Sequence, residues 1–176
     1  NNIPSIIVFT KWDLLNEDEE IHMNKIFKYY QSIGYNCLKT STKQNVFDNQ
    51  KIIDIIKNKV SVITGQSGVG KSSLLNNLVP ELNLETNDIS KALGRGKHTT
   101  RHVELFSIFG GFVVDTPGFS SLDLTDLSNI DIRDNFKEMF DNLEFCKYRD
   151  CMHTKEDGCY IKELVETNKI LKTRYD

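Results

Sequence analysis

The chain has 176 residues, of which 39% are hydrophobic and 27% charged, and its formal net charge is −3. This length allows one sizeable core and a small appendage that something other than apolar burial must stabilise. The acidic balance excludes a general attraction to nucleic acid, so an RNA contact would need a local basic patch. No apolar run approaches the roughly 20 residues that span a bilayer, and we expect a cytoplasmic monomer without a membrane partner.

The first predicted strand ends at a motif suited to a guanine base. Ile6-Ile7-Val8-Phe9 is typical of a central parallel strand, and Thr10-Lys11-Trp12-Asp13 follows it directly. Asp13 can accept hydrogen bonds from the ring N–H and the exocyclic amine of guanine, a pair of donors that adenine lacks. Lys11 would lie along the base and ribose. Thr10 stands where Asn is usual, which predicts a weaker tether to a phosphate loop, and by itself the motif also fits a helix-entry turn.

Helices and strands then alternate. Asn16 and Glu19 form a capping-box pair that starts a helix, and Gly34 ends it. Residues 35–40 return as a strand, in which we interpret Cys37 as a core residue. The tripeptide after this strand fits a second loop contacting the base: Ser41, Thr42 and Lys43.

A complete phosphate-binding loop lies between a predicted strand at 60–64 and a helix that starts at Lys71 and ends before Pro80. Glycines let the backbone wrap the phosphates, N–H groups at the helix start supply positive dipole, and Lys71 adds full charge. Ser72 is expected to ligate magnesium. Alone, this loop does not distinguish ATP from GTP. The predicted contacts are Gly65, Gln66, Ser67, Gly68, Val69, Gly70, Lys71, Ser72 and Ser73.

Two more strands, at 103–108 and 112–114, are close enough to form a tight hairpin. Asp115-Thr116-Pro117-Gly118 follows and matches a third phosphate-side motif, in which Asp115 holds magnesium through water and the Gly118 amide senses the γ-phosphate. An ordinary Pro-Gly turn is the alternative. Phe119 stands where some GTPases place a water-orienting glutamine, and a phenyl ring cannot polarise water.

The segment Gly94–Arg101 is glycine-rich and basic, which is typical of a switch loop that closes on a γ-phosphate. One of Thr99 and Thr100 is expected to reach magnesium, with Thr100 as the candidate ligand beside Ser72. His98 could orient or deprotonate the attacking water. From the residues alone, a contact of His98 with RNA phosphate is an equally good interpretation.

Three cysteines and one histidine crowd together near the end of the chain: Cys146, Cys151, His153 and Cys159. Three thiolates and one imidazole are the ligands of a closed, structural zinc site holding one ion. Reduced free thiols are the alternative. Metal binding would let this short polar segment fold with little core of its own.

The order of the motifs indicates the fold, because the base motif precedes the phosphate loop, whereas ordinary GTPases have the phosphate loop first. We therefore predict an α/β, circularly permuted P-loop GTPase fold, with a mostly parallel sheet and one antiparallel edge hairpin. This GTPase domain would span residues 1–130, and a small zinc-binding helical domain, cut short at its end, would span 131–176.

These residues resemble the bacterial RsgA family of circularly permuted GTPases, also named YjeQ or YloQ. The resemblance covers nearly the whole chain and is most specific in the phosphate loop, Gly94–Arg101, 115–120 and the Cys/His set. It implies a GTPase that converts GTP to GDP and phosphate as a late maturation factor of the small ribosomal subunit, whose rRNA it contacts and which stimulates it. Family members also carry an N-terminal OB-fold domain, so we expect this chain to be a fragment.

Carried over residue by residue, the resemblance implies phosphate and magnesium contacts for Lys71 and Ser72, guanine recognition by Asp13, and a catalytic role for His98 together with Lys71. Two other functions stay open. One is a nucleotide-gated module that binds the ribosome and hydrolyses GTP only for release. The other is a P-loop enzyme that uses ATP.

Overall fold

The computed structural model describes residues 3–41, 48–84, 103–118 and 125–176. The chain divides into two compact units, residues 1–31 with 35–122 and residues 32–34 with 123–176. The predicted domain boundary after residue 130 stays a prediction. In the described residues, no helix has the length and apolar character needed to cross a membrane.

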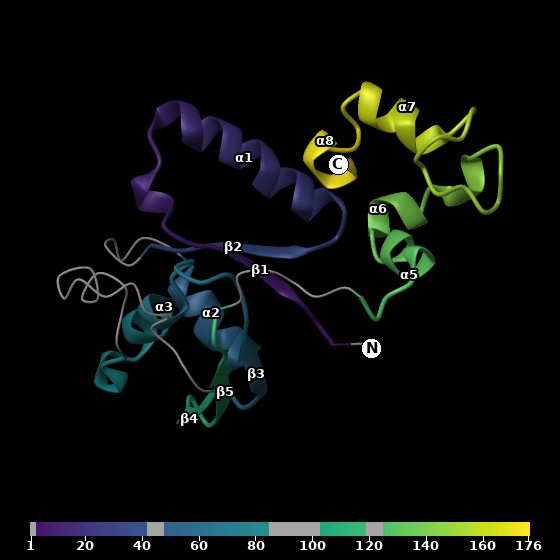
Figure 1. Cartoon of the computed structure of the whole chain (residues 1–176). Coiled ribbons are helices and arrows are strands. Elements are labelled where there is room, and N and C mark those ends of the chain that lie inside the picture. The colour runs from purple at the N-terminus through teal and green to yellow at the C-terminus, as the bar shows by residue number, and fades with distance from the viewer. Residues whose placement is uncertain (1–2, 42–47, 85–102, 119–124) are drawn as a thin grey trace, which may run out of the picture. The chain divides into compact units, whose positions relative to one another are not determined.

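The first unit begins with a parallel pair of strands joined by a long helix. Strand β1 (Ile6–Phe9) pairs with β2 (Asn36–Lys39), and α1 (Glu17–Ser32) connects them (Figure 1). The predicted capping box starts α1: the Asn16 N–H donates to Glu19 at 2.9 Å, and the Glu19 N–H donates to Asn16 at 3.0 Å. The ring of Phe9 on β1 meets Phe27 on α1 edge-on, with centroids 5.4 Å apart, so aromatic packing holds the helix against the strand.

A second sheet has the order β3-β5-β4, formed by Val60–Ile63, Gly111–Asp115 and Glu104–Ile108. Strands β3 and β5 are parallel, whereas β4 and β5 form an antiparallel hairpin. Its turn residues Phe109 and Gly110 both have positive φ, 52° and 74°, which suits the twist of a two-residue hairpin. The predicted mostly parallel pairing with an antiparallel edge is confirmed. Among the described residues it is divided between two sheets.

Two short helices supply the core of this unit. They are α2 (Asn49–Ile56) and α3 (Lys71–Leu78), the latter ending before Pro80 as predicted. Their apolar residues pack with strand residues into one cluster, in which Leu75 is fully buried. The buried members of the cluster are Leu38, Ile52, Ile56, Leu74, Leu75, Leu78 and Val113.

The second unit consists of short helices joined by turns. They are α5 (Asn129–Asp134), α6 (Lys137–Phe140), α7 (Tyr160–Glu166) and α8 (Lys172–Tyr175) (Figure 1). The sequence beyond Gly118 predicts helical structure around 134–140, and the structure divides this stretch between α5 and α6. The buried cluster of this unit combines apolar residues with all three of its cysteines: Met139, Cys146, Cys151, Cys159, Ile161, Leu164 and Ile170.

Candidate functional site

The predicted nucleotide contacts lie directly after strands, at the ends where the chain leaves them. Thr10 follows β1, Ser41 comes two residues after β2, and Gly65 comes two residues after β3. Asp115 is the last residue of β5. Carboxyl ends of parallel strands are where open α/β sheets bind ligands. The fold therefore gathers motifs that are far apart in the sequence.

The base motif contacts the phosphate loop directly. The hydroxyl of Thr10 donates to the carbonyl of Val69 at 2.6 Å, and the Lys11 ammonium donates to the carbonyl of Gly68 at 2.7 Å. These bonds join residues 59 and 57 positions apart. Asn usually joins this motif to the phosphate loop, and here the Thr10 hydroxyl forms the bond. That this bond is weaker than one from Asn stays a prediction.

The two predicted base loops are also bonded to each other. The Ser41 hydroxyl donates to Oδ1 of Asp13 at 2.5 Å, and the Trp12 N–H donates to the Thr40 carbonyl at 3.2 Å. Asn77 on α3 donates to the carbonyl of Ser41 at 3.2 Å. Ser41 is 1% exposed. Asp13 is therefore oriented by the hydroxyl of a buried serine, and the backbone carbonyl of that serine is held by the helix that follows the phosphate loop.

Trp12 is a structural part of the site that sequence reasoning missed. Its indole N–H donates to Glu20 at 3.2 Å, and the Lys39 ammonium lies 3.9 Å from the centre of a Trp12 ring. Burial lowers the pKa of Lys39, with partial opposition from the charge of Glu20. The sequence did carry a signal for this structural role. A large aromatic residue between Lys11 and Asp13 packs against neighbouring residues, and this packing anchors the loop.

Lys71 and Gly118 bring the phosphate-side motifs together. The buried Lys71 ammonium donates to the carbonyls of Gly65 at 2.9 Å and Gln66 at 3.2 Å. A Cβ on Gly118 would lie 2.5 Å from the Ser67 Cα and 2.9 Å from the Lys71 Nζ, so only glycine fits at this position. Asp115-Thr116-Pro117-Gly118 consequently lies against the phosphate loop, as expected of a third phosphate-side motif.

Asp115 offers a place for a cation. Its side chain is 1% exposed, its Oδ2 accepts from the Ser72 hydroxyl at 3.4 Å, and its Oδ1 has no partner among the described residues. Burial raises the pKa of Asp115, and the nearby Lys71 charge partly opposes this. A buried carboxylate oxygen beside a hydroxyl suits a hard divalent cation that prefers oxygen ligands.

Several predicted site residues lie outside the described part of the chain. They are Thr42, Lys43, His98, Thr99, Thr100 and Phe119. Their roles stay predictions, as do those of the described contacts. Ser73 lies in the first turn of α3 and is half-buried.

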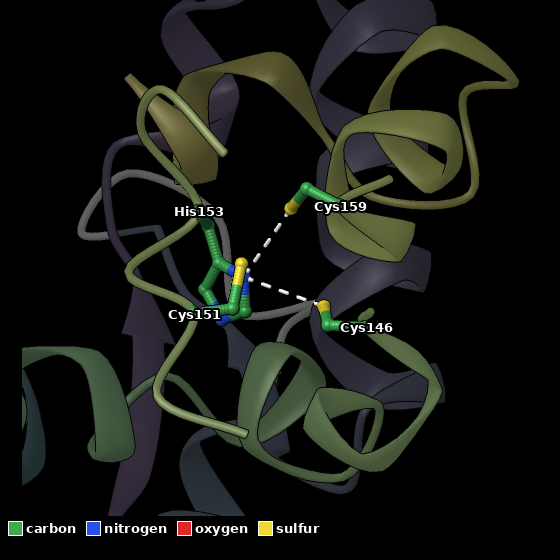
Figure 2. A group of neighbouring side chains, drawn as sticks. All are labelled: Cys146, Cys151, His153 and Cys159. Carbon is green, nitrogen blue, oxygen red and sulfur yellow. Dashed lines mark hydrogen bonds between the residues drawn. The ribbon is translucent and has the colours of Figure 1, made fainter. Parts of the chain in front are cut away.

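The four predicted metal ligands form one cluster in the second unit. Figure 2 shows the side chains of Cys146, Cys151, His153 and Cys159 directed toward one another. Their candidate ligand atoms all lie within 4.8 Å of one another, and all four residues are buried. The His153 Nδ1 is 3.4 Å from the sulfur of Cys159 and 3.7 Å from that of Cys146. A tetrahedral ion with bonds of about 2.3 Å to sulfur and about 2.0 Å to nitrogen separates such atoms by about 3.5 Å.

Burial favours the neutral forms of two members of this cluster. Burial raises the pKa of the Cys151 thiol to about 12, and burial likewise lowers the pKa of His153. Thiolates, the form that binds metal, are therefore disfavoured here unless a positive ion compensates their charge. The spacing, burial and chemistry of the donors fit a bound metal ion, and the four residues form a site able to hold one.

Comparison with known proteins agrees with this geometry. A family model described as RsgA GTPase matches residues 1–125. A relative from Shouchella clausii is 49% identical over 99% of this chain and 59% of its own length, and one from Bacillus subtilis is 47% identical over 100% of this chain and 59% of its own. Both are named small ribosomal subunit biogenesis GTPase RsgA. The chain thus spans 59% of the length of these relatives.

Solved structures resemble the chain over nearly its whole length. YloQ, described as a circularly permuted GTPase, is 37% identical with a TM-score of 0.72, over 97% of this chain and 53% of that one. YjeQ from Thermotoga maritima is 35% identical with a TM-score of 0.77, over 99% and 57% respectively. Together with the order of motifs, these likenesses show a circularly permuted GTPase fold with a C-terminal Cys/His segment.

Proposed function

Because the chain belongs to the RsgA GTPase family, we propose that it is the nucleotide-binding part of a GTP hydrolase that matures the small ribosomal subunit. The subunit and its rRNA are the proposed partners, and the subunit stimulates hydrolysis. The protein acts in the cytoplasm as a monomer.

One observation carries this proposal: the base motif and the phosphate loop are joined by hydrogen bonds from Thr10 to Val69 and from Lys11 to Gly68. Asp13 therefore lies a short distance from the loop that would hold phosphates. The carboxylate of Asp13 accepts from the two guanine donors, and the Ser41 hydroxyl holds its orientation. The Asp13 carboxylate then selects guanine over adenine, because adenine lacks the pair of hydrogen-bond donors.

On the phosphate side, Lys71 exchanges its carbonyl partners for phosphate oxygens when GTP binds, and the N–H groups of the loop donate to the other phosphate oxygens. The Gly118 amide faces the γ-phosphate. Ser72 and Asp115, with Thr100 or Thr99, would hold a magnesium ion, which would supply positive charge to balance the phosphates.

We assign the water-orienting role to His98, since the phenyl ring of Phe119 cannot polarise water. Binding to the small subunit would place His98 beside the attacking water, so we expect hydrolysis to be slow for the protein alone. The ion in the Cys/His cluster is a structural zinc, because three thiolates and one imidazole close its coordination shell.

Guanine recognition is tested by replacing Asp13 with Asn and measuring the affinity for GTP and XTP. An amide offers a donor where guanine also has donors, so GTP affinity should fall about 100-fold or more, while XTP affinity rises. The matched control is Asp18→Asn, which removes the same charge from an exposed position in α1. An unchanged preference for GTP, or a new preference for ATP, overturns the guanine assignment.

Hydrolysis is tested by single-turnover assays of the whole protein with and without purified small subunits. We expect strong stimulation by subunits, lost in His98→Ala, whereas GTP affinity stays within about twofold because His98 acts mainly in the transition state. If His98→Ala and the wild-type protein hydrolyse GTP at equal rates with subunits present, His98 is instead interpreted as an RNA contact. Absence of stimulation by subunits would favour some other partner.

A further inference from the structure

The carboxylate of Glu156 is bound by a cradle of backbone N–H groups. Its Oε1 accepts from Met152 at 2.9 Å, and its Oε2 accepts from Thr154 and from Lys155, both at 2.9 Å. Met152 and Thr154 are the immediate neighbours of His153. One side chain therefore holds the backbone on both sides of a metal-ligand candidate.

The backbone at His153 needs such support, because its φ is 61°, in the left-handed region that non-glycine residues seldom occupy. The N–H groups around it are turned toward Glu156. Its own carbonyl accepts from the hydroxyl of Tyr175, and the carbonyl of Cys151 accepts from Arg133 at 3.2 Å. The segment from Cys151 to Lys155 is thus fixed through both its donors and its acceptors.

The charge of Glu156 is well matched to this cradle. Hydrogen bonds from the backbone N–H groups lower the pKa of Glu156 to about 2. The ionised carboxylate is accordingly the form that the loop binds, and charge-assisted bonds of this kind are the stronger ones. Glu156 is not itself a member of the Cys/His cluster.

We propose that Glu156 is a positioning residue that preforms the metal site, by holding the His153 backbone in the conformation that directs Nδ1 toward the sulfurs of Cys146 and Cys159. This inference rests on metal binding in the proposed function. Without the cradle, the ion must itself order the loop on binding, which weakens the affinity. Residues that orient metal ligands typically contribute 10–100-fold to metal affinity.

The test replaces Glu156 with Gln in the whole protein and measures zinc affinity by competition with a chromophoric chelator. Glutamine keeps the size of the side chain but loses the charge and one acceptor oxygen. Asp157→Asn is the matched control, because it removes the same charge one residue away at an exposed position. We expect the zinc dissociation constant to rise 10–100-fold for E156Q and to stay within twofold for D157N. Equal affinities for E156Q and the wild-type protein overturn the proposal.

Two further readouts separate positioning from general stability. Co²⁺ in a regular Cys/His site gives tetrahedral d–d absorption bands, which should shift or broaden in E156Q but not in D157N. Amide hydrogens of Met152, Thr154 and Lys155 should exchange faster in E156Q with zinc still bound, and unchanged exchange contradicts the cradle.

If E156Q does not fold, E156D keeps the charge on a shorter side chain. It should release zinc to chelator several-fold faster, and an unchanged rate overturns the proposal.

The wild-type protein distinguishes the two levels of inference. If it binds neither Zn²⁺ nor Co²⁺ in a one-to-one ratio, the metal assignment fails and the positioning role fails with it. If it binds zinc one to one and E156Q binds equally well, only the role of Glu156 is wrong.

Discussion

The two units differ in what fills their cores. In the first, the buried cluster is aliphatic and comes from β2, α2, α3 and β5, so the proposed nucleotide site contributes no ligand-binding group to this core. In the second, the ligand candidates Cys146, Cys151 and Cys159 are members of the core itself. A site can thus either be carried by a core or form part of one, and the two cases predict opposite responses to loss of the ligand.

Removing the metal should have the largest effect. A strong chelator should unfold the second unit, since its buried thiols and imidazole lose the ion that holds them together. The first unit should keep its fold and its nucleotide binding, because its core is aliphatic. Two-dimensional NMR spectra of the protein with and without chelator would show this. Loss of dispersed signals from both units at once contradicts the comparison.

Leu75→Ala should be the reciprocal change. Leu75 is fully buried in the first core, and such a truncation typically lowers the free energy of unfolding by about 2–5 kcal/mol. Leu14→Ala is the matched control: Leu14 is 59% exposed, and its loss should cost less than about 0.5 kcal/mol. Denaturant unfolding followed by first-unit signals gives both values. Zinc content should stay unchanged, and a loss of zinc in Leu75→Ala argues against separate cores.

A buried ion pair contributes to the second unit besides the cysteines. Glu138 accepts from Arg174 at 2.7 and 3.1 Å, and Arg174 lies 4.6 Å from the Phe136 ring. The Glu138 side chain is only 3% exposed. Glu138→Gln removes the negative charge that faces the arginine and should lower the free energy of unfolding by about 3 kcal/mol, the lower end for a buried pair.

The control for this prediction is the exposed pair of Lys137 and Asp141, whose side chains are 55% and 50% exposed. Lys137→Gln should change stability by less than about 1 kcal/mol. Thermal unfolding of the zinc-loaded protein compares the two variants. Equal effects would mean that the pair of Glu138 and Arg174 behaves as a surface pair.

The smallest predicted effect concerns the Thr10 hydroxyl. Thr10→Val removes its bond to Val69 but keeps the shape of the side chain. A single hydrogen bond contributes about 1 kcal/mol, so affinity for GDP should fall by about fivefold. Thr10→Ser keeps the hydroxyl and should bind as the wild type does. Fluorescence titration or calorimetry measures both, and equal affinities for T10V and T10S would show that the Thr10 hydroxyl does not contribute to GDP binding.

Much of the local structure followed from residue patterns. The Asn16 and Glu19 capping box, the start of α3 at Lys71 and its end before Pro80 were all predicted, because capping chemistry and proline act over a few residues. The division of the 134–140 pattern into α5 and α6 was not predicted. Helix boundaries are weakly encoded when a segment is short and takes its stability from packing.

By itself, the sequence determined which chemical groups are present and in what order: a guanine-type carboxylate upstream of a phosphate loop, and four soft ligands near the end. Only the tertiary structure decided that Thr10 and Lys11 bind the carbonyls of Val69 and Gly68, and that Glu156 cradles the backbone around His153. The physical reason is that residue patterns report periodicity and local propensity. Packing of the whole chain decides that residues 59 positions apart form a hydrogen bond. It also decides which carboxylate the backbone N–H groups beside His153, a residue with left-handed φ, donate to.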